Sequence, residues 1–227
     1  GTVLFDVQTA ELAWALIMAA MRSIAEEDRA VRAGRWQTTL GRELAGSTLG
    51  LAGLGELGQR IARWAHAFDM TVLAWSPHLD PALAREHGVE AVGKDALFER
   101  SDIVSVHLRL APSTIGLVGE RELRLLGPRG LLVNTSRGPI VEEAALVNAL
   151  NSGTIAGAAP SRASMPTSRR RAAVATSSTS AGPRPMPVAT AVAAPVTSRV
   201  SSAAPGWRRS TASTKGVSSE CRVDHSR

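Results

Sequence analysis

Residues 48–62 read TLGLAGLGELGQRIA, and this stretch decides which fold the chain can adopt. It opens with a short apolar run ending in glycines, which is typical of a buried strand. The glycines at positions 53, 55 and 58 have the spacing GxGxxG. From Glu56 to Phe68 the apolar residues recur at helical spacing. The stretch therefore predicts a strand, a tight turn and a helix in direct succession.

The three glycines have different physical roles in such a turn. Gly53 permits the sharp change of direction, Gly55 lets the backbone approach a pyrophosphate, and Gly58 lets the helix pack closely on the strand. The start of the helix offers unpaired N–H groups and a positive dipole to a phosphate. We therefore predict a dinucleotide-binding loop. The alternative is a plain strand–helix turn in which the glycines serve only the backbone.

Short apolar strands and helices alternate around this stretch. Strands are expected at 70–75, 89–92, 102–108, 130–134 and 154–158, and helices at 80–88, 95–100, 120–126 and 142–151. Upstream, Thr9 is expected to cap a long helix over residues 10–33, which Gly34 ends. This alternation predicts an α/β fold of the Rossmann type, a doubly wound parallel sheet with helices on both faces. Ligands of such sheets bind beyond the carboxyl ends of the strands.

A second motif, NTSRGPIV at residues 134–141, follows directly after an expected strand. Its Arg137 would stand at the carboxyl edge of the sheet, where a guanidinium can grip a carboxylate with two hydrogen bonds and polarise a neighbouring carbonyl. The alternative is a surface arginine before a helix cap.

The position that selects between cofactors carries no acid. A carboxylate about 20 residues after the glycines usually binds the ribose hydroxyls of NAD. Ser76 occupies that position, and Asp80 lies four residues later, where it is expected to cap a helix. No arginine stands there to hold the 2′-phosphate of NADP. NAD is the preferred cofactor, and NADP stays open.

Four segments together resemble the D-isomer-specific 2-hydroxyacid dehydrogenases, a family that includes phosphoglycerate, glycerate, formate and D-lactate dehydrogenases. They are the helix start at 9–11, GLAGLGELGQRIA at 50–62, SDIVSVHL at 101–108 and LLVNTSRGPIVEEAALVNAL at 131–150. The resemblance covers residues 3–158. It implies a two-lobed oxidoreductase acting on CH–OH groups, which moves a hydride between NAD(H) and a 2-hydroxy or 2-oxo acid.

The resemblance also implies which residues form the site. Arg137 matches the catalytic arginine that binds the substrate's carboxylate and carbonyl. His107 would be a wall of the cofactor site and not the acid/base, and no metal is expected. The cofactor-binding positions are Gly53, Gly55, Glu56, Leu57, Gly58, Ser76, His107, Leu108, Arg109, Thr135, Ser136 and Arg137.

The composition changes abruptly after residue 158. Residues 159–227 hold 11 basic and 2 acidic residues and no Leu, Ile or Phe, whereas residues 1–158 hold 15 basic and 18 acidic residues. A segment without large aliphatic residues cannot bury enough apolar surface to fold. We therefore expect a linking helix over 1–35, an NAD-binding domain over 36–158 and a disordered basic tail over 159–227.

The tail also interrupts the resemblance. The family continues with a catalytic Glu and His, whereas the tail offers only Glu220, Asp224 and His225, outside any family context. We expect a truncated domain with impaired catalysis, and we interpret the tail as the product of a reading-frame shift in a GC-rich coding sequence. The alternatives are a non-catalytic dinucleotide-binding fragment, or a genuine basic tail that binds nucleic acid or an acidic membrane surface through charge alone.

The remaining features set the cellular context. The longest apolar run, at 12–21, is too short to span a bilayer and lacks the features of a secretory signal. The single Cys221 excludes an internal disulfide. We expect a cytoplasmic protein with no specific nucleic-acid partner and no membrane contact, which can form a homodimer through its long helix.

Overall fold

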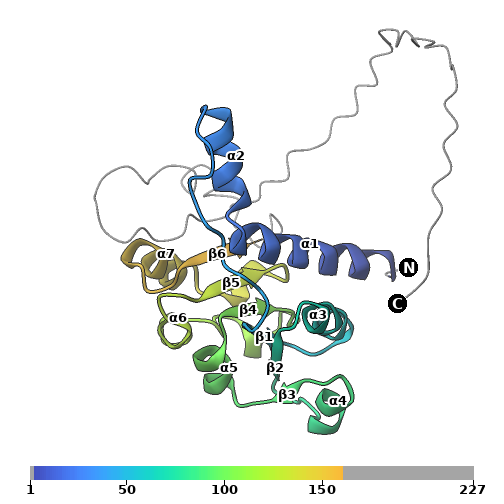
Figure 1. Ribbon diagram of the computed structural model, residues 1–227. Helices are drawn as coiled ribbons and strands as arrows, with labels where there is room; N and C mark the ends of the chain where they lie inside the picture. The colour runs from blue at the N-terminus through green and yellow to red at the C-terminus, as the bar shows by residue number, and fades with distance from the viewer. Residues whose placement is uncertain (1–2, 161–227) are drawn as a thin grey trace, which may run out of the picture. The chain divides into compact units, whose positions relative to one another are not determined.

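Six parallel strands in the order β3-β2-β1-β4-β5-β6 form the sheet of the computed structural model, which describes residues 3–160 (Figure 1). They are β1 (Thr48–Ala52), β2 (Thr71–Trp75), β3 (Glu90–Ala91), β4 (Ile103–Val106), β5 (Leu131–Asn134) and β6 (Gly157–Pro160). The strand order reverses between β1 and β4, as in the Rossmann fold. The predicted fold class is confirmed.

Helices cover both faces of the sheet (Figure 1). One face carries α1 (Val3–Met21), α3 (Glu56–Ala67) and α4 (Pro81–Glu86); the other carries α5 (Lys94–Arg100), α6 (Glu120–Leu126) and α7 (Glu143–Ser152). The helix α2 (Ile24–Arg32) extends from the end of α1 away from the sheet (Figure 1). Two short 3-10 helices, η1 (Pro112–Thr114) and η2 (Gly138–Ile140), lie in the loops after β4 and β5.

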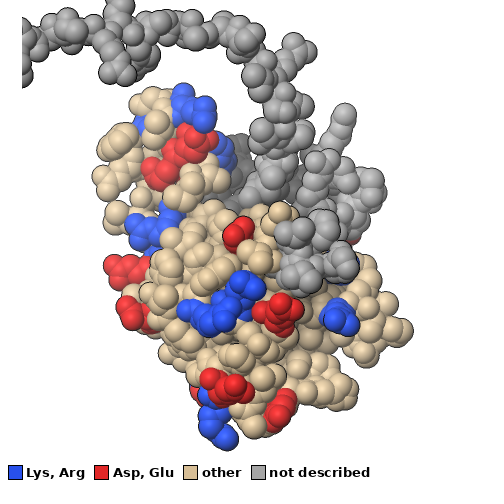
Figure 2. Space-filling view, turned by 90° about the vertical axis from the view of Figure 1, so that its right-hand side faces the viewer, with Lys and Arg blue, Asp and Glu red and all other residues tan. Residues whose placement is uncertain are grey.

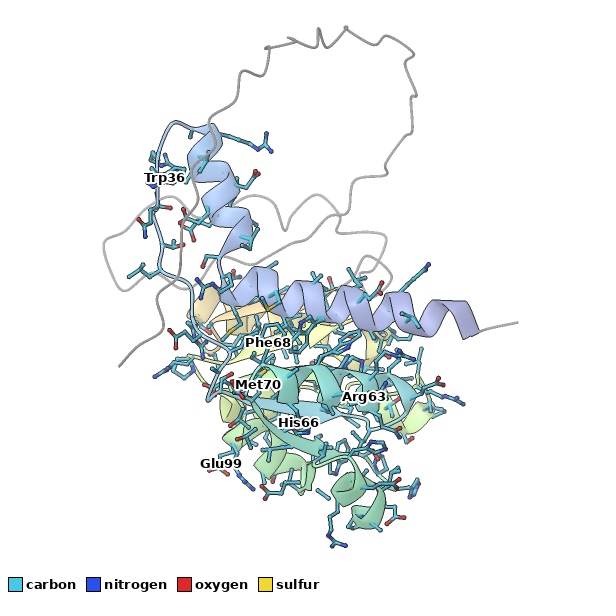
Figure 3. All side chains as sticks on the ribbon, turned by 45° about the vertical axis from the view of Figure 1, so that its right-hand side comes forward. Trp36, Arg63, His66, Phe68, Met70 and Glu99 are labelled. Carbon is cyan, nitrogen blue, oxygen red and sulfur yellow. The ribbon has the colours of Figure 1, made fainter. Side chains whose placement is uncertain are left out.

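The strands separate two hydrophobic cores. In β4, Ile103 belongs to the core beneath α1 and α3, whereas Val104 and Val106 belong to the core beneath α5, α6 and α7. Burial on both faces explains why these strands read as continuous apolar runs without alternation. Trp14 of α1 packs edge-on against Trp64 and Phe68, with ring centroids 6.2 Å and 5.2 Å apart, so α1 is held to α3. Phe68 is labelled in Figure 3.

The prediction of one helix over residues 10–33 is wrong about where the helix starts and about its continuity. α1 begins at Val3, so Thr9 lies inside the helix and does not cap it. The helix breaks at Ser23, which has a left-handed φ of 53°. The N–H of Arg42 donates to the carbonyl oxygen of Met21 at 2.6 Å, so the returning chain takes an acceptor at the end of α1. The stop at Gly34 is confirmed by its φ of 71° just after α2.

The last strand begins later than expected. Thr154 donates its N–H to the Ala149 carbonyl oxygen at 2.9 Å and so still belongs to the turn that closes α7, whereas Ala156 donates to the Gly130 carbonyl oxygen at 2.9 Å, just before β5. β6 therefore starts at Gly157 and includes Ala159 and Pro160, two residues beyond the expected end of the domain. The expectations for the tail concern residues that lie almost entirely outside the described part of the chain.

The surface of the described residues mixes both signs of charge. Figure 2 shows basic and acidic side chains interspersed over one face, in keeping with the nearly balanced charge of residues 1–158. Among the helices described, none is long and apolar enough to cross a membrane. The cytoplasmic location stays a prediction.

Candidate functional site

The carboxyl ends of four adjacent strands bring the predicted site residues together. The Gly53 N–H donates to the Trp75 carbonyl at 2.8 Å, and the His107 N–H donates to the Ala52 carbonyl at 2.8 Å. These bonds continue the sheet just past β1, β2 and β4. They place the glycine loop between Ser76 on one side and His107 on the other, at the point where the strand order reverses.

Two of the three glycines are required by the protein's own packing. Gly53 has a φ of 110°, and a Cβ there would lie 3.0 Å from the backbone of His107. A Cβ on Gly58 would lie 2.3 Å from the carbonyl oxygen of Gly53, so only a glycine lets α3 approach β1 this closely. These contacts confirm the turn and packing roles predicted for Gly53 and Gly58.

Gly55 differs from its two neighbours in the motif. Its φ of −74° suits any residue, and a Cβ there would meet nothing within 4 Å. The protein itself therefore does not require a glycine at this position. Gly55 is the N-cap of α3 and supplies no side-chain cap, so the first N–H groups of the helix, at Glu56 and Leu57, are not capped by a side chain. An exposed, open space beside such groups fits the phosphates of a dinucleotide.

His107 forms the wall beside this loop. Its Nε2 lies 2.8 Å from the hydroxyl oxygen of Ser105, a fully buried residue of β4. Its Nδ1 is buried and has no hydrogen-bond partner among residues 3–160. Burial lowers the pKa of His107 from 6.5 to about 4. The imidazole is therefore neutral at pH 7. Its Nδ1 is available to a bound ligand.

The loops after β4 and β5 are tied to each other. The Ser136 hydroxyl donates to the Leu108 carbonyl oxygen. Thr135 is 6% exposed, and its hydroxyl oxygen is buried with no hydrogen-bond partner among the described residues. Arg109 and Arg137 are exposed, and Arg137 Nη1 donates to the Ser136 carbonyl at 3.0 Å. The arginine therefore stands at the open side of the same edge.

Asn134 is a positioning residue that the sequence reasoning missed. Its Oδ1 accepts the Ser136 N–H at 3.0 Å, and its Nδ2 donates to the Arg137 carbonyl at 3.0 Å. The side chain thus fixes the turn that presents Arg137. An asparagine at a strand end before a turn is a known local signal for this bonding pattern. Ser105 was also missed, because nothing in a buried strand marks one serine as a partner of a histidine.

Asp80 caps a helix, as predicted. Its Oδ1 accepts the Ala82 N–H at 2.8 Å at the start of α4. Ser76, just after β2, is half-buried. Within residues 3–160, no group of three or more His, Cys, Asp or Glu side chains could hold a metal ion.

Comparisons with known proteins agree on one family. Residues 14–160 match the model described as D-isomer specific 2-hydroxyacid dehydrogenase, NAD binding domain. The glyoxylate reductase of Thermococcus litoralis is 41% identical over 159 residues, which make up 66% of this chain and 48% of that protein. The D-3-phosphoglycerate dehydrogenase of Archaeoglobus fulgidus is 40% identical over 155 residues, 67% of this chain and 29% of that protein.

Solved structures give the same result. A phosphoglycerate oxidoreductase from Vibrio cholerae is 37% identical, with a TM-score of 0.66, over 72% of this chain and 55% of that one. A D-lactate dehydrogenase with NAD+ from Lactobacillus jensenii is 28% identical, with a TM-score of 0.62, over 68% of this chain and 47% of that one. The chain spans about half the length of these proteins, or less.

Proposed function

The chain belongs to the D-isomer-specific 2-hydroxyacid dehydrogenase family and contains its NAD-binding domain, and on that premise we propose that the whole protein transfers a hydride between NAD(H) and a 2-hydroxy or 2-oxo acid. The observation that carries the proposal is the open space beside Gly55. It lies at the reversal of the strand order, between two glycines that the fold itself requires.

Each segment of the carboxyl edge has a part in binding. The N–H groups of Glu56 and Leu57 bind the pyrophosphate with the aid of the α3 dipole. The ring of His107, the side chain of Leu108 and the hydroxyl of Thr135 line the cofactor, with Arg109 and Ser136 at the margin. When bound, NAD supplies the hydride-transfer chemistry.

Arg137 is the residue we assign to the substrate. Its guanidinium holds the carboxylate with two hydrogen bonds and stabilises negative charge on the adjacent oxygen during hydride transfer. Asn134 fixes the backbone that presents it. Residues outside this edge of the sheet select one 2-hydroxy or 2-oxo acid over another.

We expect proton delivery to the substrate to limit turnover by this chain. A general acid works best with a pKa near the operating pH. The His107 ring is already neutral at pH 7, because burial lowers its pKa to about 4, and a guanidinium does not release its proton. Residues 159–227 add only His225, Glu220 and Asp224. We therefore expect impaired turnover with glyoxylate or hydroxypyruvate, so that the chain by itself acts as a dinucleotide-binding module.

Calorimetric titration with NADH tests the proposal. Gly55→Val should weaken binding by roughly tenfold or more, about 1.4 kcal/mol, because the side chain fills the phosphate space. Its melting temperature should not change, because a Cβ there meets no protein atom within 4 Å.

Gly93→Val is the matched control. Gly93 also caps a helix, α5, with φ −70° and ψ 161°, and a Cβ there meets nothing within 4 Å. This variant should bind NADH as the wild type does. Equal binding by the wild type and both variants would remove the glycine loop from the site.

Self-association stays a prediction. Large apolar side chains are exposed on α2 and the segment after it, where Leu40 is 87% exposed and Trp36 is 82% exposed. Trp36 is labelled in Figure 3. Glu27 accepts hydrogen bonds from the backbone and hydroxyls of Thr38 and Thr39, which orders this segment. A second copy of the chain is the partner we propose for it, and sedimentation velocity distinguishes monomer from dimer.

A further inference from the structure

In Rossmann sites the ribose of the cofactor binds at the end of the second strand, which is β2 here. In Rossmann sites an acidic side chain here binds the 2′-hydroxyl of NAD, and its charge opposes the 2′-phosphate of NADP. Ser76 is the first residue after β2, and the preceding Trp75 carbonyl accepts the N–H of Gly53 at 2.8 Å. Ser76 is therefore fixed beside the glycine loop, where the acid would stand.

The carboxylates nearest in sequence and on the neighbouring strand are already bound to the protein. Asp80 accepts the Ala82 N–H at 2.8 Å as the cap of α4. Glu90, on the adjacent strand β3, is paired with Leu73 of β2 in register, and both of its oxygens accept hydrogen bonds from Arg100, at 2.7 Å and 2.8 Å. Asp80 is thus engaged through one oxygen at the helix cap, and Glu90 is engaged through both oxygens.

The segment around Ser76 also has no lysine or arginine that would attract the 2′-phosphate of NADP. Residues 71–80 contain neither Lys nor Arg. Within this segment, therefore, Ser76 brings no charge that would repel a 2′-phosphate or attract it. A serine hydroxyl can accept a hydrogen bond from a ribose hydroxyl or donate one to a phosphate oxygen.

We propose that Ser76 makes the ribose 2′ position permissive, so that the chain binds NADPH about as tightly as NADH. The proposal rests on the proposed NAD(H) site and adds its cofactor specificity. It assigns the lack of discrimination to one residue, which makes it testable by exchange of that residue alone.

The test is calorimetric titration of the full chain with NADH and with NADPH. The two dissociation constants of the wild type should agree within about threefold, because no full charge distinguishes the ligands. Ser76→Asp should weaken NADPH binding by roughly tenfold or more and leave NADH binding equal or tighter, because a carboxylate then faces the 2′-phosphate. Asp80→Asn should leave the ratio of the two constants unchanged.

Three outcomes overturn the proposal. A wild type that prefers NADH by tenfold or more contains a discriminating group other than Ser76. A ratio that shifts in Asp80→Asn identifies Asp80 as that group. A chain that binds neither cofactor contradicts the proposed NAD(H) site itself, whereas a strong preference for one of them contradicts only the permissive position.

Discussion

The two edges of the sheet differ in how completely their polar groups are paired. At the amino edge, Asp102 accepts the Thr48 N–H at 3.0 Å and pairs with Arg42 at 3.2 Å, just before β4 begins. At the carboxyl edge, where β4 ends, His107 Nδ1 has no hydrogen-bond partner within residues 3–160, and neither has the Thr135 hydroxyl after β5. Thus β4 is preceded by an aspartate whose two oxygens both have partners and is followed by a histidine with one ring nitrogen that has none among the described residues.

The difference separates stability from function. Nearly all buried polar groups in proteins are hydrogen-bonded, because an unpaired one costs free energy. Two such atoms at one edge lower the free energy of unfolding, and a ligand that bonds to them can offset that loss. The glycine loop divides in the same way: Gly58 is held against the carbonyl of Gly53, whereas Gly55 faces open space. Breaking the amino edge should therefore damage the fold, and altering the carboxyl edge should change binding.

Asp102→Ala should have the largest effect on stability. The substitution leaves the Thr48 N–H without its acceptor and the partly buried Arg42 guanidinium without its carboxylate, so we expect a loss of about 3 kcal/mol in the free energy of unfolding. Urea denaturation followed by circular dichroism measures it. NADH affinity of the folded protein should not change.

Asp95→Ala is the control for this substitution. Asp95 forms an ion pair with Arg121 in which both side chains are largely exposed, at 48% and 70%. Its loss should cost less than about 1 kcal/mol. An equal cost for the two alanine variants would show that the amino edge contributes no more than a surface ion pair.

The pH dependence of stability reports on the carboxyl edge. The pKa of His107 is about 4 in the folded chain against 6.5 ordinarily, because of burial. Between these values the unfolded chain binds more protons, so stability rises with pH and is lost as the pH falls from 6.5 toward 4. From pH 7 to pH 5 the loss should be about 2 kcal/mol. The hydrogen bond from Arg100 lowers the pKa of Glu90, and the stability that this adds is lost only as the pH falls below about 4.5, so Glu90 contributes little between pH 7 and pH 5.

His107→Gln tests the source of this loss. The amide does not titrate, so the free energy of unfolding of the variant should change little between pH 7 and pH 5. Denaturant midpoints at several pH values measure the slope. A slope that is the same in the wild type and in His107→Gln would assign the dependence to another group.

Short-range patterns account for what the sequence could predict. The strands, the GxGxxG turn, the Asp80 cap and the stop at Gly34 each depend on residues within a few positions of one another. The break at Ser23 has no such local signal, and beside it the Met21 carbonyl oxygen accepts the N–H of Arg42, a residue far along the chain. The unpaired atoms of His107 and Thr135 were equally hidden, since only the packed sheet shows which polar groups lack partners.

Thr135→Val should change the free energy of unfolding least among these substitutions. The sign of that change tests whether the Thr135 hydroxyl lacks a partner. Valine has the shape of threonine without the hydroxyl, so the substitution removes a buried polar atom that has no partner among the described residues. Without cofactor, stability should stay equal or rise by about 0.5–1 kcal/mol. Thr114 provides the contrast, because it is equally buried, at 6% exposed, but its hydroxyl donates to the Arg109 carbonyl and accepts the Ala111 N–H, both at 2.8 Å. Thr114→Val should lose about 1–2 kcal/mol. Urea midpoints of the two variants, measured side by side, test this contrast. A loss of stability in both variants would mean that the Thr135 hydroxyl is bonded in solution. The contrast between the two edges would then no longer hold for β5.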